Sequence, residues 1–104
     1  MQKAYLRVTA LEYIDWFPGF LRCELKDRHG KIHEFVEKIP VVCGADSQYG
    51  AESLYPIEIT FDCTLMDCLN DGYLISTEEP YHIASEEGIT EFEVNNDQVI
   101  LRSS

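Results

Sequence analysis

The sequence lacks most of the features that identify a class of protein by themselves. No stretch approaches the ~20 consecutive apolar residues that a membrane-spanning helix needs, and the start of the chain has no apolar segment like that of a signal peptide. Glycine-rich phosphate loops, calcium-binding loops and nucleophile elbows are also missing. These absences predict a cytoplasmic protein with no membrane partner and no cofactor.

Basic residues are scarce as well. The 104 residues include 8 Lys and Arg against 19 Asp and Glu, which gives a formal net charge of −11. Since proteins bind nucleic acids largely through Lys and Arg, this composition argues against a nucleic-acid partner. It favours a basic protein partner, whose association would weaken as salt rises. The alternative is that the acidic residues, which are distributed along the chain, only maintain solubility.

What the sequence does contain is alternation of apolar and polar residues, which predicts strands. Seven segments show it, at residues 4–14, 20–27, 31–42, 57–68, 73–77, 89–94 and 98–102. In the first segment the apolar positions change parity near residues 10–12, which predicts a β-bulge. We therefore expect one all-β domain over residues 1–104, a small antiparallel barrel or sandwich. The irregular segment 43–55 predicts a long loop, and loops of that length are often functional.

The four cysteines do not form a recognisable site. Cys23 and Cys63 fall on the apolar positions of their strands and are predicted to be core residues, whereas Cys43 and Cys68 lie at strand ends. Cys63 and Cys68 have opposite parity in one strand, which opposes a zinc site or a redox pair. We expect reduced thiols and no metal.

The three histidines, His29, His33 and His82, are expected to be solvated surface residues. Asp27 and Glu34 are close to His33 in sequence, as carboxylates that orient a functional histidine would be. No third group for a Cys–His nucleophilic pair is evident.

Glu37 is the most unusual carboxylate, because it shares the parity of Phe35 and interrupts an apolar face. One interpretation is an ion pair with Lys38 or Arg22 at a strand edge. The other is a carboxylate at the mouth of a barrel that faces a ligand or partner. In the second case Glu37, His33 and the 43–55 loop would form the site of a small-ligand-binding or enzymatic barrel, although no motif identifies an enzyme.

Aromatic residues offer a different site. Trp16 lies in the Pro-Gly turn, and Tyr49 and Tyr55 lie in or beside the 43–55 loop. If the loop folds towards the turn, these side chains would form an exposed anchor among carboxylates, as in an interface hot spot.

The run from Trp16 to Leu25, followed by Phe35 to Val41, resembles a pattern in short bacterial proteins. The pattern is a turn, an alternating strand, Asp-x-x-Gly and Phe-Val-x-Lys-x-Pro, and it covers the first half of the chain. The resemblance implies a small β-barrel similar to the second domain of translation elongation factors, and no catalytic residues.

Our leading hypothesis is a non-catalytic protein-binding module, such as a bacterial immunity or antitoxin protein that neutralises a basic nuclease.

Overall fold

The alternating segments of the sequence become seven strands. The computed structural model describes residues 2–17, 19–38 and 54–101, and all structural statements below refer to them. The strands are β1 (Gln2–Ile14), β2 (Phe20–Lys26), β3 (Ile32–Lys38), β4 (Ile57–Leu69), β5 (Gly72–Ser76), β6 (Glu91–Asn95) and β7 (Val99–Leu101), with the short 3₁₀ helix η1 (Asn96–Gln98) before β7. The predicted all-β class is confirmed, with small shifts at the strand ends. No helix in these ranges is long and apolar enough to cross a bilayer.

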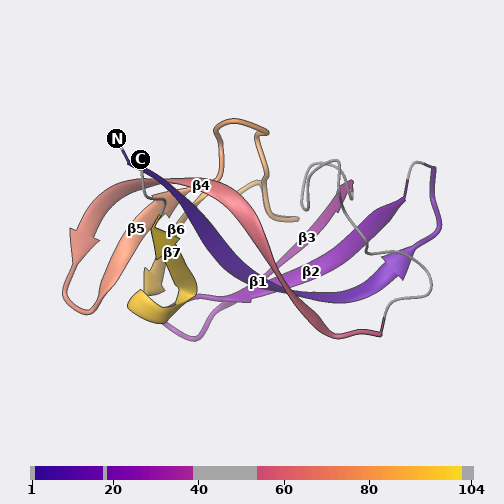
Figure 1. Ribbon diagram of the computed structural model, residues 1–104, viewed down its shortest axis with the longest axis horizontal. Helices are drawn as coiled ribbons and strands as arrows, with labels where there is room; N and C mark the ends of the chain where they lie inside the picture. Colours follow the sequence, from indigo (N-terminus) through magenta and orange to yellow (C-terminus); the bar gives the residue numbers. More distant parts are fainter. Residues whose placement is uncertain (1, 18, 39–53, 102–104) are drawn as a thin grey trace.

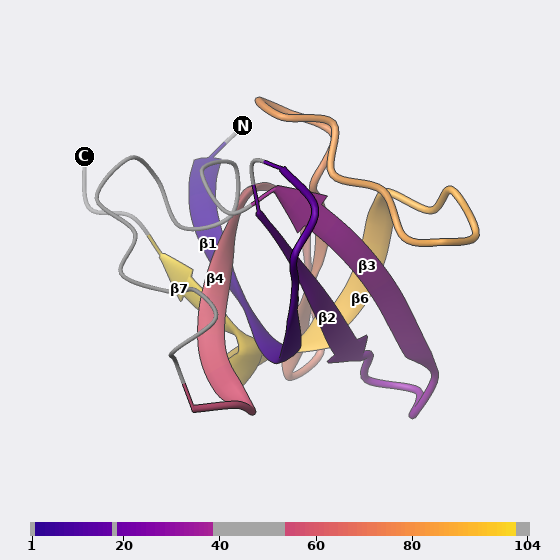
Figure 2. The same ribbon diagram turned by 90° about the vertical axis from the view of Figure 1, so that its right-hand side faces the viewer.

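The strands form one antiparallel sheet that curls into a half-barrel (Figures 1 and 2). The order is β3-β2-β1-β4-β5-β6, and β7 pairs with β1. The long strand β1 is the centre of this arrangement: it pairs with β4 along its first part and with β2 along its last part. Its opening residues also pair with β7, with Ala4 opposite Leu101.

Curling brings the two outer strands of this order, β3 and β6, towards each other. The backbone N–H of Arg28, in the β2–β3 turn, donates to the carbonyl of Glu93 at 3.0 Å. The N–H of Glu86, in the β5–β6 connection, donates to the carbonyl of Glu34 at 2.8 Å. We call this line of contact the β3–β6 seam. It completes the wall around the core without a continuous ladder of hydrogen bonds.

The predicted β-bulge is confirmed in β1. The pairing with β2 shifts register between Ala10 and Glu12. Before the shift Ala10 is buried opposite Cys23, and after it Tyr13 packs against the core opposite Leu21. A bulge adds one residue to one strand, so here it returns the apolar side chains of β1 to the inner face.

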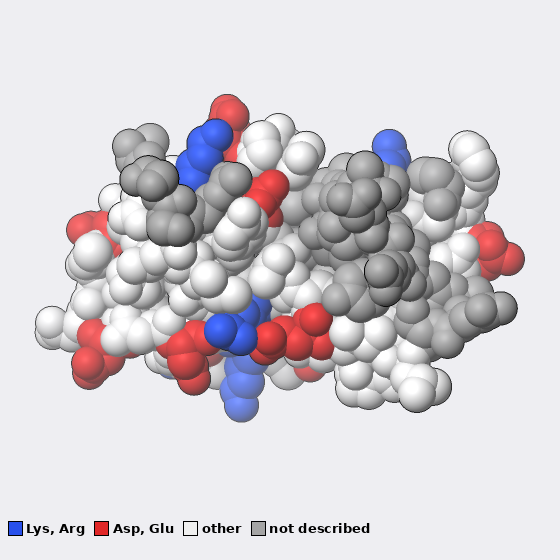
Figure 3. Space-filling model, in the orientation of Figure 1, with Lys and Arg blue, Asp and Glu red and all other residues white. Residues whose placement is uncertain are grey.

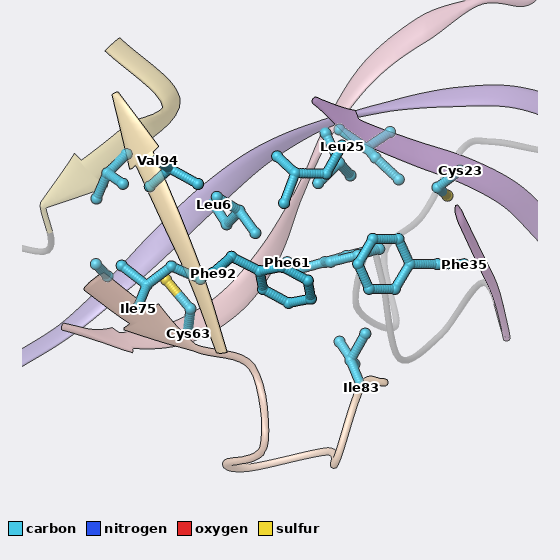
Figure 4. Packing of buried hydrophobic residues seen from close by; sticks show 14 of the residues in the cluster. Leu6, Cys23, Leu25, Phe35, Phe61, Cys63, Ile75, Ile83, Phe92 and Val94 are labelled. Carbon is cyan, nitrogen blue, oxygen red and sulfur yellow. The ribbon is translucent and has the colours of Figure 1, made fainter. Parts of the chain in front are cut away.

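Side chains fill the interior of the half-barrel (Figure 4). Phe35 of β3 packs edge to face against Phe61 of β4 and Phe92 of β6, with ring centroids 5.1 and 5.7 Å apart. Cys23 and Cys63 are both buried in this cluster, as their parity predicts. Burial raises the pKa of the Cys63 thiol to about 12, so this sulfur packs as a protonated, apolar group.

The turn between β4 and β5 explains one glycine. Asp71 adopts a left-handed conformation with φ of 60°. Gly72 begins β5 and lies opposite Asn95 of the neighbouring strand β6. A Cβ atom on Gly72 would lie 2.2 Å from the carbonyl oxygen of Val94. Only glycine allows β6 to approach this closely.

Candidate functional site

The most exposed apolar side chains lie at one end of the molecule. Phe17 is 99% exposed and Trp16 is 61% exposed, both in the connection between β1 and β2. Leu54, which precedes β4, is 88% exposed. Figure 1 shows the β1–β2 connection and the start of β4 towards the same end of the long axis, and Figure 2 shows that they lie at opposite edges of that end. We call Trp16, Phe17 and Leu54 the apolar end.

The backbone holds the Trp16 turn in place. The N–H of Trp16 donates to the carbonyl of Ile14 at 2.9 Å, and the N–H of Gly19 donates to the carbonyl of Trp16. Gly19 has a φ of 107°, which a side chain would strain. The Trp16 ring packs edge to face on Phe20, with centroids 5.8 Å apart. Trp16 is therefore presented in an ordered position, which lowers the entropy that a binding event would cost.

The other residues of the predicted aromatic anchor differ from Trp16. Tyr55 is half-buried and packs against the core cluster, so it is not part of an exposed anchor. Tyr49 lies outside the described residues, as does most of the 43–55 loop. The predicted association of Tyr49 with Trp16 therefore stays a prediction.

Two carboxylates flank the turn. The Glu12 carboxylate accepts a hydrogen bond from Arg22 Nε at 3.0 Å. Asp15 is exposed, and its Oδ1 accepts from the hydroxyl of Tyr13 at 3.4 Å. Carboxylates next to exposed aromatic residues fit the predicted composition of an anchor for a basic partner.

His33 lies inside the protein, so the expectation that it is a solvated histidine is wrong. Its residue exposure is 5%, and its ring packs edge to face on Phe92 with centroids 4.8 Å apart. Its Nε2 lies 2.8 Å from Oδ2 of Asp27. His33 shares the inward parity of Phe35, which is the sequence signal for its burial. The ring Nδ1 is also buried and has no partner among the described residues.

Asp27 is the orienting carboxylate that the sequence placed near His33. Its Oδ1 accepts hydrogen bonds from the backbone N–H groups of His29, at 2.8 Å, and Lys31, at 3.0 Å. Burial opposes the ionisation of this carboxyl, but the hydrogen bonds from His33 and from the two N–H groups outweigh it and lower the pKa of Asp27. Asp27 thus fixes the β2–β3 turn and His33 at the same time, which is a structural task.

Glu37 is half-buried on the inner face of β3, opposite Leu21. Burial raises its pKa, while the positive charge of Lys38 and an interaction with His82 act in the other direction. The ion pair shown for Arg22 is with Glu12. Glu37 and His33 do not come together, because they are four residues apart along β3, about 13 Å, with buried Phe35 between them.

Two pockets lie away from these residues. One of about 270 Å³ lies beside β1 between the end of β2 and η1, and is lined in part by Arg7, Glu24 and Asp97. The other, of about 70 Å³, is lined by Lys3, Cys63 and Glu79 among others. Glu37 and His33 line neither pocket. Within the described ranges no group of His, Cys, Asp and Glu is arranged to hold a metal ion.

Cys63 and Cys68 lie in different environments, but the opposite parity predicted for them is not the cause. Cys63 is buried and Cys68 is exposed, both as free thiols. The β4–β5 pairing shifts register between Leu65 and Asp67, so alternation along β4 is interrupted between the two sulfurs. Cys68 is exposed because it lies beyond the core near the end of β4. Cys43 lies outside the described residues.

Comparisons with known proteins add no family to this description. No family model matches the sequence, and no curated protein or solved structure is significantly similar to it.

Proposed function

We propose that this chain is a non-catalytic module that binds a basic protein through its apolar end. The observation that supports the proposal most is the exposure of Phe17, Trp16 and Leu54 at one end, at 99%, 61% and 88%. Trp16 and Phe17 are neighbours in one turn, and contiguous exposed apolar side chains mark interaction surfaces. The net charge of −11 makes a partner rich in Lys and Arg the natural complement.

One form of this proposal is a bacterial immunity or antitoxin protein that neutralises a basic nuclease. Small size, strong acidity and a filled interior fit a protein that acts by covering another protein. A gene for a large toxin directly upstream would support this form. Co-expression with that toxin should then restore growth.

The test is capture of the partner from a lysate of the source cells by the intact chain and by variants. Replacing both Trp16→Ala and Phe17→Ser removes the anchor, and each interface hot spot is worth about 2 kcal/mol or more, roughly a 30-fold loss of affinity. Ile32→Ala is the matched control, since Ile32 is 51% exposed but lies at the far end of the β2–β3 hairpin.

If the proposal is right, the intact chain and the Ile32 variant both retain a basic protein from the lysate, and the double variant does not. Retention should fall as salt rises. Capture of the same protein by all three forms, or capture of none, would overturn it. Circular dichroism should be the same for the three forms, and the melting temperature of the double variant should fall only by the amount that corresponds to the loss of the Trp16–Phe20 contact, about 0.5–1.5 kcal/mol.

A second candidate function, a small-ligand or enzymatic site at Glu37, is favoured by the raised pKa of that carboxyl. The filled interior opposes it, because a barrel that holds a ligand needs an internal cavity. Soaking crystals in a fragment library separates the two. Fragments gathered at Glu37 would support the second candidate, and fragments confined to other surfaces would remove it.

A further inference from the structure

Charge is divided unequally between two parts of the chain. Residues 2–38 contain seven Lys and Arg against six Asp and Glu, so their charges nearly cancel. Residues 54–101 contain eleven Asp and Glu and no Lys or Arg. The whole-chain net charge of −11 therefore arises almost entirely from the second part.

The topology turns this division of the sequence into a division of the surface. The sheet order β3-β2-β1-β4-β5-β6 places residues 2–38 in one half of the wall and most of residues 54–101 in the other. We call the part formed by residues 54–101 the acidic half. Basic side chains reach it where the halves meet: Arg7 pairs with Glu58 at 2.9 Å across β1 and β4, and Lys31 pairs with Glu87 at 3.6 Å across the β3–β6 seam.

Away from these two lines of contact the carboxylates of the acidic half have no Lys or Arg in their own part of the chain, and Glu78 lies 3.8 Å from the imidazole Nδ1 of His82. Figure 3 shows one face on which most Lys and Arg side chains lie beside carboxylates, while carboxylates at both ends of the long axis stand apart. Excess charge of one sign on one surface attracts the opposite charge at long range.

The acidic half also exposes apolar side chains. Five of the eight exposed large apolar residues belong to it, namely Leu54, Met66, Tyr81, Ile100 and Leu101. Tyr81 is 49% exposed and lies in the β5–β6 connection just after Glu78 and Glu79. A protein-binding surface combines carboxylates with apolar side chains of this kind.

We infer that the acidic half is the surface that contacts the positively charged face of the partner, and that the outer face of β2 and β3 faces away from it, whereas the Trp16 turn between β1 and β2 contacts an apolar part of the partner. This inference rests on the proposed function and adds to it the orientation of the complex. The complementary partner presents Lys and Arg over a broad face, with an apolar depression at one edge of that face.

The inference can be tested without the natural partner, by comparing two double variants that change the net charge equally. Glu79→Gln with Glu91→Gln removes two exposed carboxylates from the acidic half. Glu24→Gln with Glu34→Gln removes two from the outer face of β2 and β3, where they lie directly opposite each other. No ion pair involves any of the four among the described residues.

The measurements are the salt concentration at which each form elutes from an anion exchanger, and the affinity of each form for poly-L-lysine. The acidic-half variant should elute at clearly lower salt, with a shift at least about twice that of the β2–β3 variant. Its affinity for poly-L-lysine should fall by the larger factor as well. Equal effects of the two variants in either assay would mean that only net charge matters and would overturn the inference.

Failure here is distinguishable from failure of the proposed function. Trp16→Ala changes no charge, so it should leave both assays unaltered while it weakens capture of the partner. If the two charge variants behave alike but Trp16→Ala weakens capture, the inferred orientation of the complex is refuted and the binding anchor stands. If the charge variants differ but Trp16→Ala leaves capture unchanged, the anchor is refuted instead.

Discussion

The strongest prediction concerns Asp27, because three donors converge on its carboxylate. Asp27→Ala removes the acceptor of two backbone N–H groups, at 2.8 and 3.0 Å, and the partner of His33 Nε2 at 2.8 Å. Water can replace the carboxylate at the exposed turn, but not at His33, which is 5% exposed. A buried polar group without a partner costs about 1–3 kcal/mol, and each hydrogen bond to a charged group contributes about 1.5–3 kcal/mol. We expect a total loss of about 2–4 kcal/mol.

Urea unfolding at pH 7 measures this loss, with Asp97→Ala as the control because Asp97 is an exposed carboxylate in η1. A surface change of that kind is within about 0.5 kcal/mol of neutral. For a domain of this size the Asp27 variant should melt about 4–8 °C lower for each kcal/mol lost. A loss below about 1 kcal/mol would refute the assignment of Asp27 as the residue that holds both the turn and His33.

The same residue predicts a pH dependence. The pKa of Asp27 is lower in the folded protein than in the unfolded chain, so its contribution is complete above the unfolded value of about 3.9. It is lost as the pH falls through the folded value. The difference between the intact chain and the Asp27 variant should thus be constant from about pH 5 to 8 and shrink below about pH 4. A difference that grows in acid would contradict this account.

Two further predictions follow from burial. Glu37→Gln should stabilise the protein at neutral pH, because burial raises the pKa of Glu37 and penalises its charged form. The gain in free energy of unfolding should become smaller as the pH falls towards the pKa of about 4.3 in the unfolded chain. Urea unfolding at several pH values measures it, and a gain that is the same at every pH would contradict this account. Iodoacetamide at pH 8 should modify Cys68, which is exposed, and spare Cys63, which is buried and has a pKa of about 12; peptide mapping that finds Cys63 labelled in the folded protein would show that β4 opens readily.

Local patterns were sufficient to predict the strands, the turns and even the bulge in β1, because each depends on residues close together in the sequence. The β3–β6 seam could not be predicted, since Arg28 and Glu93 meet only after the whole sheet has curled. His33 was misjudged because its place after a polar turn outweighed its parity with Phe35. The charge division was visible in the sequence, but a whole-chain count of acidic and basic residues conceals it.

The elongation-factor-like topology implied by the resemblance remains a prediction, whereas the apolar end was predicted in part. Trp16 was identified from its turn, but Leu54 was not, because a leucine next to a strand is usually a core residue. Its 88% exposure is a property of the connection before β4, which has no alternating pattern from which burial could be predicted.

The position of β1 has a consequence for how the protein forms in the cell. Within this sheet β1 is synthesised first; it pairs with β2 soon afterwards, with β4 after some fifty residues, and with β7 last, where Ala4 meets Leu101. Pairings that are distant in the sequence form slowly, because a long loop must close before they contribute. While synthesis proceeds, the β1–β3 meander must therefore keep its apolar inner face uncovered until β4, β5 and β6 arrive. Chains arrested in that interval are the form of this protein most prone to aggregate.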